Sequence, residues 1–262
     1  MILAVDVGNS NTTVGLFNGT GELLFRALLE TSRSKTRDQC AIELLGVFRL
    51  YGADACTVDG AILSSVVPPL TTIFTDAIAR LTGIPPMVVG PGIRTGLNIK
   101  AEIHNQLGSD IVASSVAAIA KYPSPIVMVD MGTATSLSLI VGSVYEGCII
   151  MPGLALALDA LSERAAALPP ISIETASPVG LMGHTTEEAM RSGVLYGHAS
   201  MVDGMLERIE ESIGQSVTTV ATGGNAPRIL RYCKRPIQYD ADLIMTGLYL
   251  LYQKNAKKYR KA

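Results

Sequence analysis

Hydrophobic and polar positions in the first half of the chain predict strands and helices in alternation. Short apolar runs that end at Gly, Asn or Pro are typical of strands, whereas apolar residues three and four positions apart are typical of amphipathic helices. The expected strands are 2–7, 12–17, 22–30, 59–67 and 86–90, although 22–30 also fits a helix. The expected helices are 36–52, 69–83 and 108–122.

The second half of the chain repeats this order. Strands are expected at 125–132, 134–142, 142–153 and 217–224, and helices at 154–168, 185–214 and 241–255. Antiparallel strands lead each half and helices alternate with strands after them, so we predict an α/β fold of two lobes with mixed sheets. The boundary is expected near residue 120, without a flexible linker, which gives an N-terminal lobe of residues 1–120 and a C-terminal lobe of residues 121–262.

One short stretch occurs twice. AVDVGNSNTTVGLF (4–17) and VDMGTATSLSLIV (129–141) each place an Asp at the end of an apolar run, then Gly and several small polar residues, then a second apolar run. A tight turn of this kind gathers backbone N–H groups and hydroxyl or amide side chains, which suits a phosphate group. The carboxylates of Asp6 and Asp130 repel phosphate, but they can hold a cation that bridges to it.

A single turn of this type is more often an ordinary hairpin than a ligand site. Two matching copies, each leading one half of the chain, favour a clamp for one polyphosphate. A third element, VATGGNA (220–226), is a strand that ends in Gly-Gly. Strand-ending glycines are common turns, but they also allow a nucleoside to approach the backbone closely. Together the three elements favour a nucleotide-binding protein.

Composition narrows the class of protein further. The chain has 262 residues, 48% of them hydrophobic, and a net charge of -2, which is enough for a sizeable core and gives little support for nucleic-acid binding. We expect no signal peptide, because polar Asp6 interrupts the N-terminal apolar run, and no membrane span. The four cysteines lack disulfide or zinc spacing, so we expect reduced thiols in a cytoplasmic protein.

The order and spacing of eight stretches resemble those of the type III pantothenate kinases, which belong to the actin-like ATPase and sugar/acetate kinase superfamily. The stretches are DVGNSNTTVGLF (6–17), SSVVPPL (64–70), GPGIRTGLNIK (90–100), LGSD (107–110), VDMGTAT (129–135), MPGLALALDAL (151–161), AMRSGVLYG (189–197) and ATGG (221–224). The resemblance implies two RNase H-like lobes with the active site in the cleft between them. It also implies ATP-dependent phosphorylation of pantothenate to 4'-phosphopantothenate, the first step of coenzyme A biosynthesis, by a homodimer.

The same resemblance assigns roles to residues. Asp110 matches the catalytic base, which would accept the proton of a primary hydroxyl, whereas an isolated Asp in a first helical turn would more often be a capping residue. Asp6 matches the Asp associated with Mg²⁺, and Asp130 the residue linked to a monovalent cation, K⁺ or NH₄⁺. The implied ATP-binding residues are Asp6, Val7, Gly8, Asn9, Ser10, Asn11, Thr12, Thr13, Thr133, Gly223 and Gly224. The implied pantothenate-binding residues are Gly108, Ser109, Asp110, Ile111 and Thr186, the last from the partner subunit.

The chain departs from the family pattern at three places, which we expect to lie on the acceptor side. Ile111 stands where the family has Arg, Ser138 where it has Asp, and AEIH (101–104) where it has Tyr-Asp-Asn-Pro. Arg94 or Lys100 could supply a cation for the pantothenate carboxylate, and His104 could line the pocket, although surface roles are at least as common. Two alternatives therefore stay open: a kinase of another small hydroxylated acceptor, and a non-catalytic relative that binds nucleotide or pantothenate.

Overall fold

The computed structural model describes residues 1–100, 107–173 and 179–259, which form two compact units. Unit 1 comprises Met1–Lys121 together with Asp242–Ala262, and unit 2 comprises Tyr122–Ala241. The change of unit after Lys121 lies close to the boundary expected from the sequence. The expected second lobe of residues 121–262 differs from unit 2, because the chain returns to unit 1 at Asp242.

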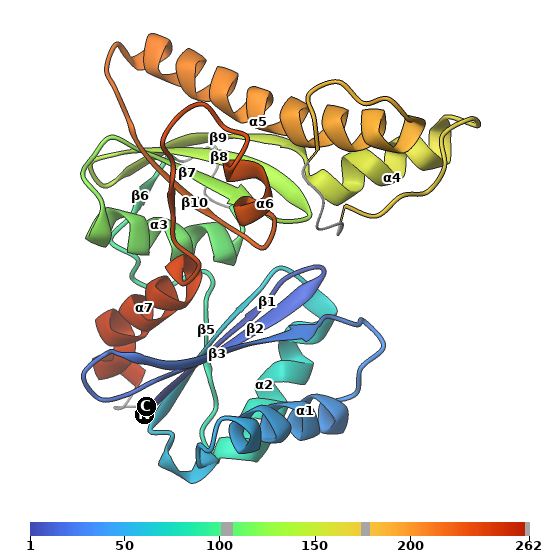
Figure 1. The fold of residues 1–262 in the computed structure, drawn as a ribbon. Coiled ribbons are helices and arrows are strands. Elements are labelled where there is room, and N and C mark those ends of the chain that lie inside the picture. Colours follow the sequence, from blue (N-terminus) through green and yellow to red (C-terminus); the bar gives the residue numbers. More distant parts are fainter. Residues whose placement is uncertain (101–106, 174–178, 260–262) are drawn as a thin grey trace. The chain divides into compact units, whose positions relative to one another are not determined.

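Unit 1 is built on a mixed five-stranded sheet (Figure 1). Its strands are β1 (Ile2–Val7), β2 (Asn11–Phe17), β3 (Leu23–Glu30), β4 (Gly60–Ser65) and β5 (Met87–Val88), in the order β3-β2-β1-β4-β5. The first three strands are antiparallel neighbours, and β1, β4 and β5 are parallel. Of the stretch 22–30, which also fitted a helix, Leu23–Glu30 form a strand, in which buried Phe25 and Ala27 alternate with exposed neighbours. A short strand, β6, covers Asn98–Ile99.

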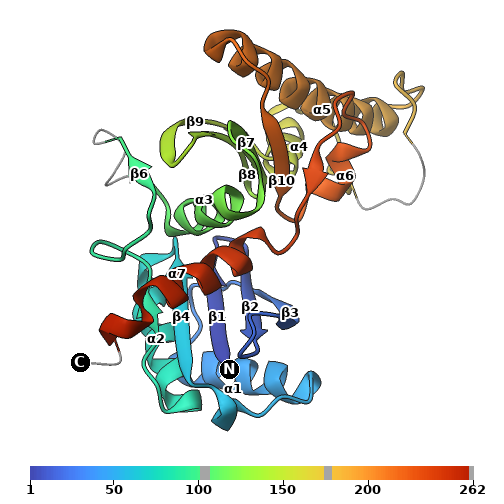
Figure 2. The ribbon, with the colours of Figure 1, turned by 90° about the vertical axis from the view of Figure 1, so that its left-hand side faces the viewer.

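Helices cover both faces of this sheet. On one face, α1 (Arg37–Leu50), the 3₁₀ turn η1 (Ala55–Thr57) and α2 (Pro68–Thr82) enclose a core with the inward side chains of β1 and β2. On the other face lie α3 (Ser109–Lys121) and α7 (Leu243–Tyr259), and α7 crosses the sheet in Figure 2. Several apolar side chains of α7, among them Met245 and Leu248, are fully buried there, which explains why this helix belongs to unit 1.

Unit 2 repeats the sheet of unit 1. Its strands β7 (Ile126–Met131), β8 (Ala134–Val141), β9 (Val144–Pro152), β10 (Thr218–Thr222) and β11 (Gln238–Tyr239) follow the order β9-β8-β7-β10-β11. Again two antiparallel pairs are followed by two parallel ones. The restart of the pattern in the sequence is therefore a repeat of one strand topology.

Three helices complete unit 2: α4 (Leu154–Arg164), α5 (Thr186–Ile213) and the short α6 (Ala226–Leu230). They pack on one face of the sheet around the buried side chains of Val129, Leu137, Leu158 and Val202. The helix expected at 154–168 ends at Arg164, and α6 was not expected from the sequence. Thr185 caps α5 through a capping box with Glu188.

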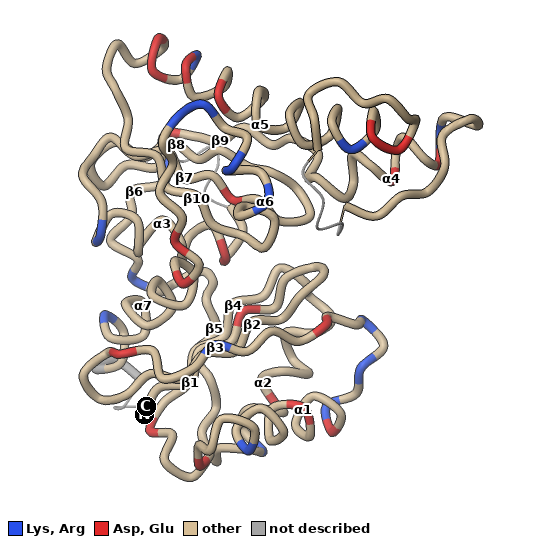
Figure 3. Tube along the Cα trace, in the orientation of Figure 1, with Lys and Arg blue, Asp and Glu red and all other residues tan. Residues whose placement is uncertain are grey.

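The described residues contain no helix that is both long and apolar enough to cross a membrane. Lysine and arginine are interspersed with aspartate and glutamate along both units (Figure 3). The four cysteines all lie among the described residues and are free.

Candidate active site

Each unit places an aspartate in the same position of its sheet. Asp6 is the next-to-last residue of β1, opposite Thr13 of β2 and beside Ser64 of β4. Asp130 is the next-to-last residue of β7, opposite Ser136 of β8 and beside Thr222 of β10. Residues that pair across neighbouring strands project from the same face of a sheet. Each carboxylate is therefore flanked by two hydroxyl side chains at the end of its strand.

The first predicted phosphate turn joins β1 to β2. The Gly8 N–H donates to the carbonyl oxygen of Asn11 at 3.0 Å, and the tip residues Asn9, Ser10 and Asn11 are exposed. A Cβ on Gly8 would lie 2.9 Å from that carbonyl oxygen, so the turn itself requires glycine. Thr12 differs from the tip residues, because its buried hydroxyl shares a 2.8 Å hydrogen bond with Thr31.

The second predicted phosphate turn joins β7 to β8 and is one residue shorter. The Gly132 N–H donates to the carbonyl of Ala134 at 3.0 Å, and Thr133 and Ala134 are exposed. The carbonyl of Thr133 accepts from the Gly153 N–H at 3.2 Å, and a Cβ on Gly153 would lie 2.2 Å from that oxygen. Gly153 therefore supports this turn, a role that the stretch MPG (151–153) alone did not indicate.

The predicted nucleoside turn lies against this second phosphate turn. Gly223 has φ of +92°, and a Cβ there would lie 2.7 Å from Asp130 Oδ1 and from the Met131 carbonyl oxygen. Gly224 has open space around it and is exposed. Unit 2 therefore brings together three of the predicted site elements: Asp130, Thr133 and the glycine pair.

Asp110 is held at the N-terminal end of α3 by its neighbour Ser109. The Ser109 hydroxyl lies 2.9 Å from the Ser64 hydroxyl and accepts from the Ser65 N–H at 3.1 Å. Because Ser64 pairs with Asp6, these contacts bring the start of α3 to the strand end that carries Asp6. Unit 1 thus gathers the first phosphate turn and the candidate base.

The carboxylate of Asp110 is largely withdrawn from water. Its Oδ1 accepts from the Ile111 N–H at 2.7 Å and lies so close to Gly108 that a Cβ there would be 2.3 Å away. Burial raises the pKa of this carboxyl, and hydrogen bonds from the backbone N–H groups of Ile111 and of Asp110 itself oppose the rise. A carboxylate with a raised pKa is a stronger proton acceptor than an exposed one.

Thr186 lies elsewhere in unit 2, at the first position of α5. It borders a cavity of ≈ 850 Å³ whose wall is Ala166, Ala167, Leu168, Pro169, Pro170, Thr185, Thr186 and Glu187. Arg94 is exposed, while its backbone N–H and carbonyl both bond to the side chain of buried Asn255 in α7, at 2.9 and 3.0 Å. Lys100 is also exposed, and AEIH (101–104), with His104, lies outside the described residues.

Ser138, one of the departures from the family pattern, lies in β8 in the interior of unit 2. It is fully buried, and its hydroxyl forms a 3.0 Å hydrogen bond with the equally buried hydroxyl of Tyr145. A hydroxyl pair needs no countercharge in the protein interior, whereas an aspartate at the same place would need one. The Ser138 side chain therefore stabilises the interior of unit 2, and the expected position of this departure near the acceptor stays a prediction.

The carboxylate and hydroxyl oxygens near Asp6 and Asp130 are suited to cations that phosphate oxygens also coordinate. Among the described residues, no cluster of three or more His, Cys, Asp or Glu could enclose a metal ion. Asp6 and Asp130 each offer one carboxylate beside hydroxyl groups instead. Mg²⁺ in phosphoryl-transfer enzymes is held by one or two carboxylates, substrate phosphates and water, so these residues fit such an ion.

Comparison with known proteins agrees with these features. A family model described as type III pantothenate kinase matches residues 2–208. The chain is 39% identical to the type III pantothenate kinase of Exiguobacterium sp. (strain ATCC BAA-1283 / AT1b), over 98% of this chain and 100% of that protein. It is also 39% identical to the type III pantothenate kinase of Geobacillus thermodenitrificans (strain NG80-2), over 98% of this chain and 99% of that protein. The chain belongs to the type III pantothenate kinase family.

The likeness to solved structures confirms the predicted fold class. The activator of the 2-hydroxyisocaproyl-CoA dehydratase from Clostridium difficile, solved with bound ADPNP, matches with a TM-score of 0.58 at 11% identity. The match covers 99% of this chain and 97% of that chain. This chain therefore shares with the activator the actin-like ATPase fold, an α/β fold of two units that each have a mixed sheet.

His198 in α5 anchors the strand that follows the second phosphate turn. Its Nε2 lies 2.9 Å from the hydroxyl of Thr135, and both side chains are buried. Burial lowers the pKa of His198, so the folded protein binds a proton there less readily than the unfolded chain. Stability from this pair is present at neutral pH and is lost as pH falls below about 6.5, the ordinary pKa of histidine.

We expect His198→Gln, which keeps a polar partner but does not titrate, to lose less stability than the wild type between pH 7 and pH 5. Thr135→Val should lower the free energy of unfolding by about 1–3 kcal/mol, because it leaves the buried imidazole without its partner. Melting temperatures of the three proteins across this pH range test both statements. Equal pH slopes for wild type and His198→Gln would contradict the first.

Proposed function

We propose that this protein transfers the γ-phosphoryl group of ATP to the primary hydroxyl of pantothenate. The products are 4'-phosphopantothenate and ADP, and the reaction is the first step of coenzyme A biosynthesis. Family membership supports the reaction class, and one observation supports its location. The Ser109 contacts bring the half-buried carboxylate of Asp110 to the end of the strand that carries Asp6 and the first phosphate turn.

The nucleotide is assigned to the three turns. Both phosphate turns bind the polyphosphate of one ATP molecule through backbone N–H groups and exposed tip residues such as Asn9, Ser10 and Thr133. The adenosine part lies at the turn of Gly223 and Gly224, where exposed Gly224 has open space for close approach to the backbone. This arrangement places the two aspartates of the repeat near the phosphates.

Asp110 acts as the general base. The pantothenate hydroxyl oxygen attacks the γ-phosphorus, the bond from phosphorus to the β,γ-bridging oxygen breaks, and ADP leaves with that oxygen. The hydroxyl proton passes to Asp110 Oδ and then to solvent, so atoms and charge balance. Because the carboxylate is held by the Ile111 N–H and the helix start, it is oriented before substrate arrives.

Bound cations are proposed to balance the negative charge of the triphosphate. Asp6 would hold Mg²⁺ and Asp130 a monovalent cation, K⁺ or NH₄⁺, and these ions supply the positive charge that offsets the triphosphate. At each of these two positions the protein contributes one carboxylate and two neighbouring hydroxyl groups. Sharing each ion with the phosphates fits a protein whose described residues offer no enclosed metal cage.

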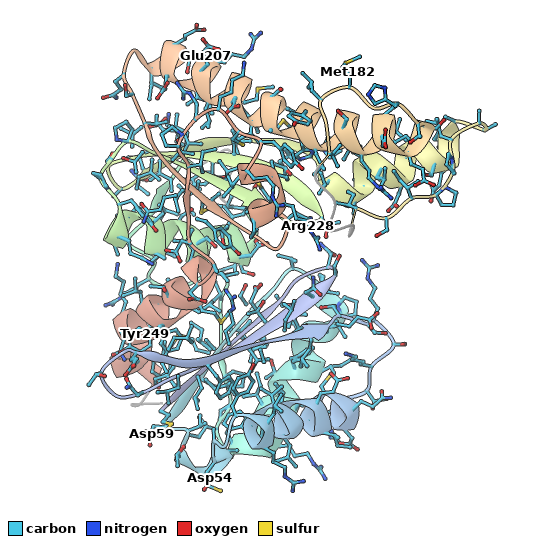
Figure 4. The ribbon with its side chains drawn as sticks, in the orientation of Figure 1. Asp54, Asp59, Met182, Glu207, Arg228 and Tyr249 are labelled. Atoms are coloured by element: carbon cyan, nitrogen blue, oxygen red, sulfur yellow. The ribbon has the colours of Figure 1, made fainter. Side chains whose placement is uncertain are left out.

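The acceptor side is proposed to include Thr186 of a partner subunit and the residues Gly108–Ile111 of the same chain. A homodimer interface is supported by exposed apolar side chains near α4 and the start of α5: Leu156, Leu161, Leu181 and Met182. Met182 projects outward ahead of α5 in Figure 4. Covering these side chains in a dimer removes apolar surface from water.

We also propose a cytoplasmic location, because the four cysteines are free thiols.

Ile111 cannot supply the guanidinium that the family pattern has at this place, so the pantothenate carboxylate needs another cation. Arg94 is suited to that role, because Asn255 fixes its backbone while its side chain stays exposed. The second candidate function is phosphorylation of another small hydroxylated acceptor, because Ile111 replaces the arginine of the family pattern.

An acceptor panel tests the proposal. Purified protein with ATP, Mg²⁺ and K⁺ is assayed for ADP release with pantothenate, pantetheine and pantoate. We expect the highest kcat/KM with pantothenate, and an Arg94→Met variant should raise its KM by about 10-fold while leaving that of pantetheine, which lacks the carboxylate, unchanged. Release of ADP only with another acceptor would reassign the substrate, and ATP binding without turnover would favour the non-catalytic relative.

Subunit mixing tests the role of Thr186. Thr186→Val should raise the KM for pantothenate by roughly 10-fold through loss of one hydrogen bond, with the KM for ATP unchanged. If Thr186 serves the partner's site, dissociating and reassociating equal amounts of the Thr186→Val and Asp110→Asn proteins restores one intact site in each heterodimer. Activity at low pantothenate should then reach about a quarter of the wild-type value. Additive residual activities would show that each chain uses its own Thr186.

A further inference from the structure

Asn225, directly after the glycine pair 223–224, contacts the second phosphate turn with both its backbone and its side chain. Its backbone N–H donates to the carbonyl oxygen of Met131 at 3.0 Å, and its Nδ2 donates to the carbonyl oxygen of Gly132 at 3.2 Å. Its Oδ1 accepts from Arg228 Nη1 at 3.2 Å. Both kinds of atom on this amide group therefore have a defined partner.

The side chain of Asn225 does not serve the helix that it precedes. Asn225 is the N-cap residue of α6, where an asparagine side chain normally accepts from the first helical N–H groups. Here no side-chain capping bond is formed, and the amide reaches across to Gly132 instead. Arg228, which projects from α6 in Figure 4, holds the other end of the amide. The arrangement therefore favours contact with the turn over stability of the short helix.

Peptide geometry gives this contact a consequence for the turn. In a trans peptide the C=O and the following N–H point in opposite directions. Fixing the Gly132 carbonyl on Asn225 thus directs the Thr133 N–H away from Asn225. The Thr133 carbonyl is likewise fixed, by the Gly153 N–H at 3.2 Å. A phosphate that approaches the exposed tip at Thr133 is therefore kept from meeting these carbonyl oxygens, which would repel it.

We propose that Asn225 is a positioning residue that couples the nucleoside turn to the second phosphate turn, so that a ligand carrying both a nucleoside and a polyphosphate is bound as one unit. This inference rests on the proposed function, because it takes the two turns as the nucleotide site. It adds a specific residue of this chain, and it predicts that ligands with a polyphosphate, nucleoside polyphosphates among them, depend on Asn225 more than a nucleoside alone does. Asn225 itself acts through the backbone of Gly132 and Thr133.

Calorimetric titration of the full-length protein with ADP, adenosine and inorganic tripolyphosphate, each with Mg²⁺, tests the coupling. Asn225→Leu removes the side-chain bonds but keeps the backbone N–H on Met131. We expect its Kd for ADP and for tripolyphosphate to rise by about 10-fold, the factor for one lost hydrogen bond, and its Kd for adenosine to stay within about two-fold. The KM for ATP should rise with the Kd for ADP, while the KM for pantothenate stays unchanged.

Two further variants make the result decisive. Asn225→Ser carries the same expectation if the leucine variant does not fold. Asn18→Leu removes an asparagine whose Oδ1 accepts from the Thr20 and Glu22 N–H groups in a hairpin turn of unit 1, and it should leave all three Kd values unchanged. Equal weakening of ADP and adenosine, or no weakening of ADP, would overturn the coupling role. A wild type that binds neither ADP nor adenosine would overturn the proposed function, and this inference with it.

Discussion

Asp110→Asn is expected to lower kcat by about 10²–10⁴-fold, the range for loss of a general base, with little change in the KM for ATP. The substitution keeps the volume of the side chain and its ability to accept from the Ile111 N–H, but it removes the proton acceptor. Steady-state assays with pantothenate, combined with nucleotide titration, measure both effects. The remaining activity reports what positioning alone contributes.

Stability distinguishes this catalytic role from a capping role for Asp110. Burial raises the pKa of the carboxyl, so the folded state binds the proton more tightly than the unfolded chain. Stability contributed by this group is therefore present at low pH and is lost as pH rises through the raised pKa. At neutral pH the neutral amide should leave the melting temperature equal or higher. A marked loss of stability with near-normal turnover would instead identify Asp110 as a helix cap.

The same pKa shift predicts the acid limb of activity. Only the ionised carboxylate accepts a proton, so kcat/KM for pantothenate should rise with pH through the raised pKa of Asp110 and then level off. The inflection is expected above the ordinary aspartate value of 3.8, because burial is the largest cause of the shift. An acid limb that remains unchanged in the residual activity of Asp110→Asn would assign it to another group.

Gly223→Ala is expected to cause the second large effect, a loss of nucleotide affinity of at least about 10-fold together with a free energy of unfolding lowered by about 1–3 kcal/mol. At φ of +92° an L side chain is strained, and the new Cβ would lie 2.7 Å from Asp130 Oδ1 and from the Met131 carbonyl oxygen. One of these groups must move, which disturbs Asp130 and the second phosphate turn at once. Titration with ADP and thermal unfolding measure the two effects.

Gly224→Ala is the matched comparison, because a Cβ at that position would meet no atom within 4 Å. Its melting temperature should equal that of the wild type. Any loss of ADP affinity in Gly224→Ala would then come from contact with the ligand itself, which the nucleoside assignment predicts. If Gly223→Ala retained full stability and affinity, the contact between this turn and Asp130 would have no functional importance.

Much of the fold could be predicted from local pattern. The run from Ile2 to Val7, the turn at Gly8 and the following strand are specified by residues adjacent in sequence, and so are their counterparts at 126–141. The assignment of α7 to unit 1 could not be read locally, because it depends on burial of Met245 and Leu248 against strands more than 200 residues earlier. The helix α4 ends at Arg164, before the expected residue 168, because Ala165 adopts an extended backbone conformation that its sequence did not indicate.

At the candidate site, the sequence identified the motif residues but not the residues that hold them in place. Asp6, Asp110 and Asp130 stand in recognisable stretches, whereas Gly153, His198 and Asn225 contribute through contacts with segments distant in sequence. The glycine in MPG and the asparagine after Gly-Gly are signals that could have been noticed. Ser138 is a further case, since the motif marked it as a departure but could not show its hydrogen bond to buried Tyr145.

A crystal structure of the protein with a non-hydrolysable ATP analogue, Mg²⁺, K⁺ and pantothenate would show whether both phosphate turns and Asp110 serve one site. We expect a single nucleotide whose phosphates contact both the Gly8 turn and the Gly132 turn, with Asp110 within hydrogen-bond reach of the primary hydroxyl of pantothenate. A nucleotide bound by only one of the turns, or a pantothenate hydroxyl remote from Asp110, would contradict it.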